Sequence, residues 1–132
     1  MKNKKLLFIV VALVIVVGGA FGAKYFYEFS SYRKAIDAIS IEEIDLQSIP
    51  DGVYTGFSDT TWVKATVEVA VKDHRIVEII LDHQHDQGEA ADVIPSRVIE
   101  AQSLQVDTIS GATNSSKVIL KAIENALRSA LQ

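Results

Sequence analysis

An uninterrupted run of 18 apolar or glycine residues, 6–23, lies close to the start of the chain. As an α-helix this run is about 27 Å long, which is close to the thickness of the hydrocarbon core of a bilayer. Three lysines precede the run, and an aromatic belt at 25–27 follows it. Aromatic side chains of this kind are enriched at membrane–water interfaces. The sequence therefore predicts an N-terminal transmembrane helix within residues 1–27, with the bilayer as a partner.

The charges that flank this run predict its orientation. Lysines on the N-terminal side favour a cytoplasmic N-terminus, which places the rest of the chain outside the cytoplasm. A cleaved signal peptide is the alternative, because small residues at 18–20 and 21–23 could form a cleavage site. The run is longer than the usual signal-peptide core of about 7–15 residues, which favours a single-pass anchor in the cell membrane. Both interpretations place the C-terminal domain outside the cytoplasm.

The exported part is acidic and lacks cysteine. Residues 25–132 carry nine basic and 17 acidic side chains, a net charge of −8. Nucleic-acid binding requires a basic surface, so we expect no nucleic-acid partner. The absence of cysteine excludes disulfides, thiolate catalysis and Cys-ligated zinc. No Ser-His-Asp arrangement and no motif-marked pair of carboxylates is present, so we predict no catalytic residue.

A change of hydrophobic period divides the exported part in two. Residues 28–49 have a thin apolar stripe at helical spacing among charged side chains, which is typical of a polar, helix-compatible spacer. The turn at 49–52 contains Pro50 and Gly52 and marks the start of a domain over residues 50–132.

Two strands and two helices are predicted within this domain. Apolar residues alternate over 62–71, which is typical of a half-buried strand, and a short turn leads to a second strand over 76–81. These strands form an antiparallel hairpin. The second strand is expected to place Val77, Ile79 and Leu81 on one face. Helices are expected over 90–103, with Pro95 in the first turn, and over about 115–131. The predicted fold class is α+β: a small antiparallel sheet or hairpin packed with two helices, preceded by the transmembrane helix.

A loop of small residues leads directly into the last helix. Its sequence is Val106-Asp107-Thr108-Ile109-Ser110-Gly111-Ala112-Thr113-Asn114-Ser115-Ser116. The small side chains over 110–113 would let a large ligand approach the backbone. Asn114, Ser115 and Ser116 are residue types that cap helices. The unpaired N–H groups at the start of a helix favour a phosphate or another anion. A capped helix without a ligand is the alternative.

The segment 107–113 resembles the D-x-x-S-G-A-T signature of the FMN-binding domain family, which includes the C and G subunits of sodium-pumping and Rnf-type redox complexes. In that family a flavin transferase attaches FMN through a phosphoester bond to the last Thr of the signature. The resemblance implies covalent FMN at Thr113. The other cofactor-binding residues that it implies here are Ser110, Gly111 and Ala112 around the phosphate, Asp107 for loop geometry or transferase recognition, and Ser115 and Ser116 as caps or phosphate contacts.

Two further segments fit the same family. Residues 51–56 resemble the D-G-x-Y-x-G segment that begins its first strand. A His followed by a Gly-containing loop helps to enclose the flavin in related domains, and His83 and Gly88 match these residues, with His85 as a second candidate. A metal site at the two histidines is the alternative, but no third ligand is implied and we predict none. The chain departs from the family pattern in lacking a double-glycine loop before the alternating strand, and in having Asp73-His74 where Asp-Gly is common.

The predicted function is that of a membrane-anchored flavoprotein that carries electrons outside the cytoplasm. A Thr hydroxyl is a poor nucleophile unless it is activated, so this chain would be the substrate of the transferase. The flavin would perform the redox chemistry with membrane or extracytoplasmic redox partners. The alternatives are a protein that binds FMN non-covalently, and an envelope interaction module with a vestigial flavin site that binds its partner through residues 28–47.

Overall fold

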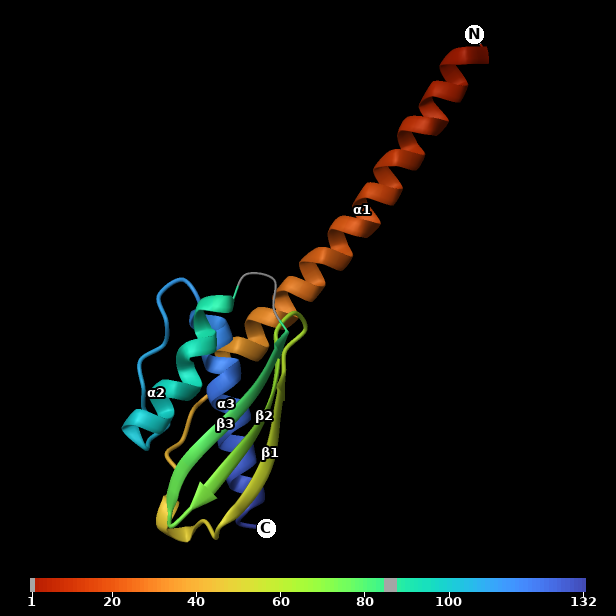
Figure 1. Cartoon of the computed structure of the whole chain (residues 1–132). Helices are drawn as coiled ribbons and strands as arrows, with labels where there is room; N and C mark the ends of the chain where they lie inside the picture. Colours follow the sequence, from red (N-terminus) through yellow and green to blue (C-terminus); the bar gives the residue numbers. More distant parts are fainter. Residues whose placement is uncertain (1, 85–87) are drawn as a thin grey trace.

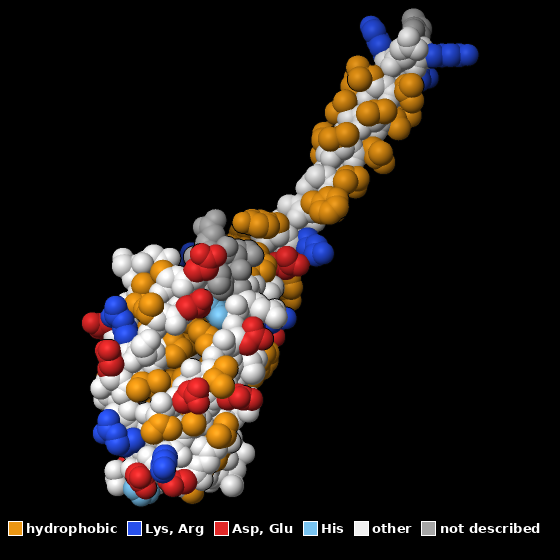
Figure 2. Space-filling view, viewed as in Figure 1, with side chains coloured by type: hydrophobic (Ala, Val, Ile, Leu, Met, Phe, Trp, Pro, Cys, Tyr) orange, Lys and Arg blue, Asp and Glu red, His pale blue; other side chains and the backbone are white. Residues whose placement is uncertain are grey.

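The computed structural model describes residues 2–84 and 88–132. Its first element is a single helix, α1 (Lys2–Asp37), which leaves the folded domain as a straight rod (Figure 1). All side chains over 6–23 are exposed, and Figure 2 shows apolar side chains along the rod with lysines at its tip. The mean hydropathy of its most apolar 18-residue window is 2.8. α1 is therefore long and apolar enough to be a membrane anchor or a signal sequence.

The segment predicted as a spacer, 28–49, divides into three parts. Residues 28–37 continue α1 without a break, and Tyr32 and Ile36 are buried against the domain. Residues 38–45 contain no helix or strand, and a single 3-10 turn, η1 (Leu46–Ser48), follows. The last turns of α1 are thus packed against the folded domain, and the helix continues into the domain without a break at residue 28.

Three strands form one antiparallel sheet in the order β1-β2-β3: β1 (Gly52–Asp59), β2 (Lys64–Lys72) and β3 (Arg75–Gln84). The predicted hairpin is confirmed as β2 and β3, and the segment 51–56 leads into β1 as its family resemblance implied. The alternation in β2 is also confirmed, because the inward-facing residues are all buried: Ala65, Val67, Val69 and Val71.

The prediction for β3 is wrong at one residue. A register shift between β2 and β3 opposes Val71 to Ile76 and Ala70 to Glu78, which leaves Val77 as the extra residue of a β-bulge. Ile76 is therefore buried, whereas Val77 is 54% exposed. Ile79 and Leu81 remain partly buried, as predicted. One inserted residue changes which alternate residues of the strand face the core, and the periodicity of the sequence does not reveal such an insertion.

Two helices complete the α+β fold, as predicted. α3 (Thr113–Ser129) packs along β1 and β2, and α2 (Ile94–Ala101) packs beside β3 (Figure 1). The helix expected over 90–103 is shorter, because residues 89–93 form a 3-10 segment, η2 (Glu89–Val93), before α2. Pro95 lies in the first turn of α2, where its missing N–H removes no helical hydrogen bond.

Gly56 allows α3 to lie close to β1. A Cβ at this residue would come 2.0 Å from the carbonyl oxygen of Ala122 and 2.4 Å from the amide nitrogen of Ala126. Any larger residue would force the helix away from the strand. The last Gly of the D-G-x-Y-x-G segment therefore serves helix packing.

A buried carboxylate ties the segment after α1 to α3. Glu124 is fully buried, and its Oε1 accepts a hydrogen bond of 2.7 Å from the Glu42 N–H. Lys121 and Arg128 form ion pairs with it. Burial alone would raise the pKa of Glu124, but the hydrogen bonds from Lys121 and Glu42 and the two positive charges lower it below the ordinary value of 4.5. Glu124 is therefore held in its charged form in the fold.

Candidate functional site

The loop after α2 returns along the domain to the start of α3, at the end from which α1 emerges (Figure 1). It closes with a tight turn in which the N–H of Ala112 donates to the carbonyl oxygen of Ile109 at 2.9 Å. Gly111 has a φ of +80° in this turn. The left-handed conformation at the third residue of a turn favours glycine, which explains why this loop needs Gly111.

Ser116 braces this turn from within the helix. Its hydroxyl accepts a hydrogen bond from the Ile109 N–H at 3.0 Å and donates one to the carbonyl oxygen of Ala112 at 2.8 Å. Ser116 is fully buried. The hydroxyl therefore joins the beginning and the end of the turn, and the loop is held to α3 by a residue that lies inside the helix.

The predicted capping of this helix by Asn114, Ser115 or Ser116 is wrong. α3 begins at Thr113, and the N-cap residue is Ala112, whose methyl group accepts no hydrogen bond. Ser116, one of the residues expected to cap the helix, binds the preceding loop instead. The first N–H groups of an α-helix have no partner within the helix, and here no N-cap side chain accepts from them. They provide hydrogen-bond donors and the positive end of the helix dipole for an anion.

Thr113 is the first residue of α3 and is exposed, as are Asp107, Ser110 and Gly111. Ala112, between them, is buried and fixes the loop to the domain. The Thr113 hydroxyl is thus presented on the surface at the start of a helix, where a second protein can reach it.

A second part of the predicted site packs against the first turn of α3. A Cβ at Gly88 would come 2.0 Å from Ser115 Oγ and 3.3 Å from His83 Cε1. The end of β3, the segment before η2 and the start of α3 therefore meet closely at this point. The structure brings His83, Gly88 and Ser115 together, although they are separated by up to 32 positions in the sequence. His85 lies outside the described residues.

Asp92 belongs to this cluster and was not singled out by the sequence. Its Oδ1 lies 2.8 Å from His83 Nδ1, and the His83 side chain is 2% exposed while that of Asp92 is 50% exposed. An acceptor at Nδ1 fixes the orientation of the imidazole ring. His83 and Asp92 are nine residues apart in the sequence, and no motif or periodic pattern indicates that they interact.

The arrangement suits the phosphate end of a nucleotide-like cofactor. It offers small residues that permit a close approach, backbone N–H groups at a helix start, and an exposed hydroxyl to which a phosphate can be esterified. Over residues 2–84 and 88–132, the structure groups no three His, Cys, Asp or Glu side chains in a way that could hold a metal ion. A groove of about 640 Å³ lies at the other end of the sheet, beside Asp73 and His74, and contains none of the predicted site residues.

Comparisons with known proteins agree with these features. The NADH:acrylate oxidoreductase of Vibrio harveyi is 29% identical over 102 residues, which is 70% of this chain but 10% of that protein, so the chain spans about a tenth of this relative. The crystal structure of the CPE2226 protein of Clostridium perfringens superposes with a TM-score of 0.52 at 25% identity, covering 63% of this chain and 89% of that chain. The model of the FMN-binding domain family matches residues 56–128, from within β1 to the end of α3. Because this match covers more than half of the sequence, the chain belongs to the FMN-binding domain family.

Proposed function

We propose that this protein is a membrane-anchored flavoprotein that holds FMN covalently through a phosphoester bond to Thr113 and carries electrons outside the cytoplasm. The observation that carries the proposal is the position of Thr113, whose exposed side chain lies on the first residue of α3, directly after the turn that Ser116 braces. A hydroxyl in this position is accessible to a modifying enzyme and adjacent to the donors that stabilise a phosphate.

The attachment step requires a second protein. The bond between Thr113 Oγ and phosphorus forms as the phosphoanhydride bond of a flavin dinucleotide donor breaks and a nucleoside monophosphate leaves. This step removes the hydroxyl proton, and an ordinary Thr hydroxyl needs a base for it. We therefore assign the activating base to a flavin transferase, with this chain as its substrate.

Once attached, FMN supplies the electron transfer, and the chain holds and orients it. The Ile109–Ala112 turn and the first N–H groups of α3 bind the phosphate, and the packed junction of Gly88 with Ser115 forms one wall of the site. The redox name of the Vibrio harveyi relative supports an electron-transfer role. Covalent attachment outside the cytoplasm prevents loss of the cofactor by dissociation.

The apolar part of α1 supports a cell-membrane location with the domain outside the cytoplasm. Such tethering keeps the flavin close to redox partners in or at the membrane. Cleavage of α1 as a signal sequence would instead release the domain, although residues 28–37 of this helix pack with the fold. The competing functions are non-covalent FMN binding and an interaction module with a vestigial flavin site.

The decisive experiment measures intact mass and visible spectrum of the full chain produced with a flavin transferase. We expect a mass gain of one FMN less one water, retained after denaturation, and a yellow protein. Thr113→Ala should abolish the gain, whereas Thr108→Ala, an exposed threonine of the same loop, should retain it. Colour that is lost on unfolding would favour non-covalent FMN. A colourless, unmodified protein would favour the interaction module.

A further inference from the structure

α1 makes an aromatic contact with the folded domain at the point where it leaves the predicted bilayer span. Trp62, at the tip between β1 and β2, packs against three aromatic rings of α1. Its ring centroid lies 5.9 Å from that of Tyr25, 5.9 Å from that of Phe29 and 5.1 Å from that of Tyr32. We call these four residues the aromatic clamp. It joins the helix to a strand hairpin that lies 30 to 37 residues further along the sequence.

The tip that carries Trp62 is itself well ordered by hydrogen bonds. The N–H and the hydroxyl of Thr60 both donate to the carbonyl oxygen of Val63, at 2.8 and 2.7 Å. Both residues are buried. The clamp therefore packs α1 against a hydrogen-bonded tip of the sheet and orients the sheet relative to the helix.

The position of the clamp along α1 gives its depth relative to a bilayer. Lys24 directly follows the apolar run, and Tyr25 is the next residue. Phe29 lies four residues further, which is about 6 Å along the helix axis. Trp62 contacts both of these rings and also Tyr32, so it lies beside the part of α1 between Tyr25 and Tyr32, a span of about 10 Å that begins at the aromatic belt. Trp and Tyr side chains are most favourable at the membrane–water interface. Tyr25, Phe26 and Tyr27 are 64–73% exposed, as expected for side chains that contact the interfacial layer.

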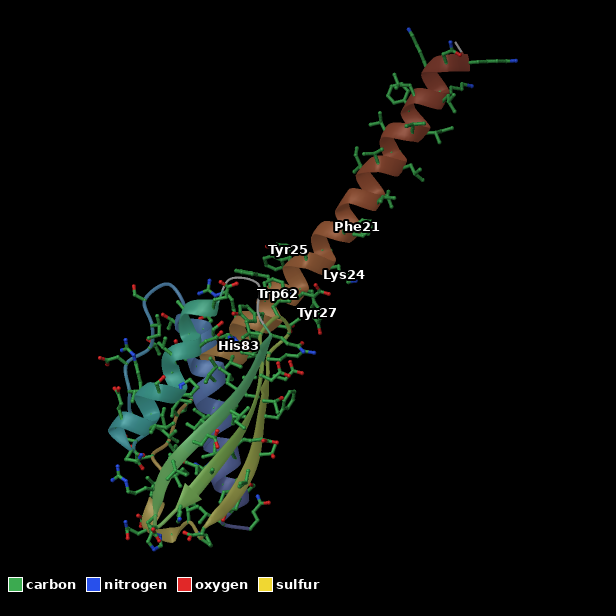
Figure 3. All side chains as sticks on the ribbon, in the orientation of Figure 1. Phe21, Lys24, Tyr25, Tyr27, Trp62 and His83 are labelled. Carbon is green, nitrogen blue, oxygen red and sulfur yellow. The ribbon has the colours of Figure 1, made fainter. Side chains whose placement is uncertain are left out.

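The same end of the sheet carries the candidate flavin site. In the register of the sheet, Asp59 lies opposite Lys64, and Lys64 lies opposite Gln84. The Trp62 tip and the end of β3 therefore lie at the same end of the strands. His83 precedes Gln84, and the segment beginning at Gly88 packs on Ser115 in the first turn of α3. Figure 3 shows Trp62 and His83 together at the end of the domain from which α1 departs.

We propose that the lipid headgroup layer is the binding partner of this end of the domain. The aromatic clamp seats the β1–β2 tip in the interface and holds the start of α3, with Thr113, facing the bilayer. The inference rests on the proposed membrane anchor. Its consequence is that a redox partner located in the membrane reaches the flavin more readily than a soluble partner that approaches from the opposite end, where α3 ends at Ser129.

Trp62 is the single tryptophan of the chain, so its emission reports the depth of the tip directly. The full chain, produced without flavin transferase, is reconstituted in phosphatidylcholine vesicles with or without bromine near the top of the acyl chains. We expect brominated lipid to remove most of the Trp62 emission. The control is the double variant Trp62→Phe with Leu131→Trp, which moves the tryptophan to the exposed C-terminal end and should be unaffected by bromine. Unquenched Trp62 emission would overturn the inference.

The orientation of α3 is tested by energy transfer to headgroup-labelled lipids. The chain has no cysteine, so Asn114→Cys and Ser129→Cys each create a unique dye site near the two ends of α3. These sites are about 22 Å apart along the helix. We expect clearly stronger transfer from position 114, and we expect Trp62→Ala to reduce the difference. Equal transfer from both positions in the native background would overturn the inference, because the domain would then tumble freely.

Neither measurement requires the flavin, which separates this inference from the proposed function. Vesicle flotation shows first whether the chain inserts. A chain that does not float with vesicles would contradict both the anchor and the docked orientation. A chain that floats but gives unquenched Trp62 emission would contradict the orientation alone. Thr113 modification is measured independently by mass.

Discussion

Gly88 lies directly against Ser115, and a Cβ at Gly88 would come within 2.0 Å of the serine Oγ and 2.8 Å of its Cβ. This contact joins the segment after β3 to the first turn of α3. It brings Gly88 and the nearby His83 against Ser115, which belongs to a separate part of the sequence. Because residue 88 is a glycine, the segment after β3 can pack closely against the first turn of α3.

We expect Gly88→Ala to destabilise the fold by about 2 kcal/mol, because the added methyl group must displace Ser115 or the first turn of α3. FMN attachment should fall with it, since Thr113 lies in the same turn. Unfolding of the full chain in detergent micelles, followed by Trp62 emission, measures the first effect, and intact mass measures the second. Glu89→Ala is the matched control at an exposed neighbour and should change stability by less than about 0.5 kcal/mol. Full stability and full attachment in Gly88→Ala would contradict the packing argument.

Ser116→Ala tests the brace of the Ile109–Ala112 turn. The variant removes the acceptor of the Ile109 N–H and should lower the free energy of unfolding by about 1–2 kcal/mol. The rate of FMN attachment at Thr113 should also fall, because the preceding loop is then less fixed. Time courses of mass gain with a constant amount of transferase measure this rate. Asn114→Ala, an exposed position two residues earlier, should leave the rate unchanged. Equal rates in Ser116→Ala and the native chain would show that the brace has no role in attachment.

Local patterns predicted most of the fold. The alternation in β2 and the helical spacing after Thr113 reflect burial on one face, which the order of residues encodes directly. The bulge at Val77 could not be predicted, because an extra residue in one strand depends on the register of its neighbour. The unbroken extension of α1 to Asp37 likewise depends on tertiary packing, in which Tyr32 and Ile36 are buried against the domain.

The candidate site was predictable where it is continuous in the sequence. Residues 107–113 lead directly into α3, and Gly111 has a φ of +80°, a conformation that glycine adopts without strain but that the sequence analysis did not predict. The role of Ser116 was not predictable, since a serine near a helix start is equally suited to cap that helix. Asp92 was missed because its relation to His83 exists only after β3 and η2 are brought together.

Glu124 should make stability depend on pH. Its pKa is lower in the fold than the ordinary value of 4.5, so its charged form favours folding above that pH, and the contribution is lost as the pH falls through the folded pKa. We expect Glu124→Gln to lower the free energy of unfolding by about 2 kcal/mol at neutral pH, since it removes the charge paired with Lys121 and Arg128. The variant should also lose less stability than the native chain between neutral pH and about pH 3.5. Glu78→Gln, an exposed carboxylate of β3, is the control. Parallel pH profiles for the native chain and Glu124→Gln would contradict this assignment.

The turn between β2 and β3 places two non-glycine residues in a left-handed conformation. Asp73 and His74 have φ values of 52° and 61°, so both occupy the left-handed region that a two-residue hairpin turn requires. This conformation costs a non-glycine residue about 1–2 kcal/mol, whereas glycine adopts it freely but is more disordered in the unfolded chain. We therefore expect His74→Gly to raise the free energy of unfolding by about 0.5 kcal/mol.

Thermal unfolding of the full chain in micelles measures this gain, and Lys72→Gly serves as its control. Lys72 is the last residue of β2, where the chain is extended and glycine brings only its entropic cost, so this variant should be less stable by about 0.5–1 kcal/mol. His74 Nδ1 also lies 3.3 Å from the carbonyl oxygen of Leu46. A loss of stability in His74→Gly would show that this contact with η1 outweighs the strain of the turn. A gain would show that backbone conformation decides the preference for Asp-Gly at this position.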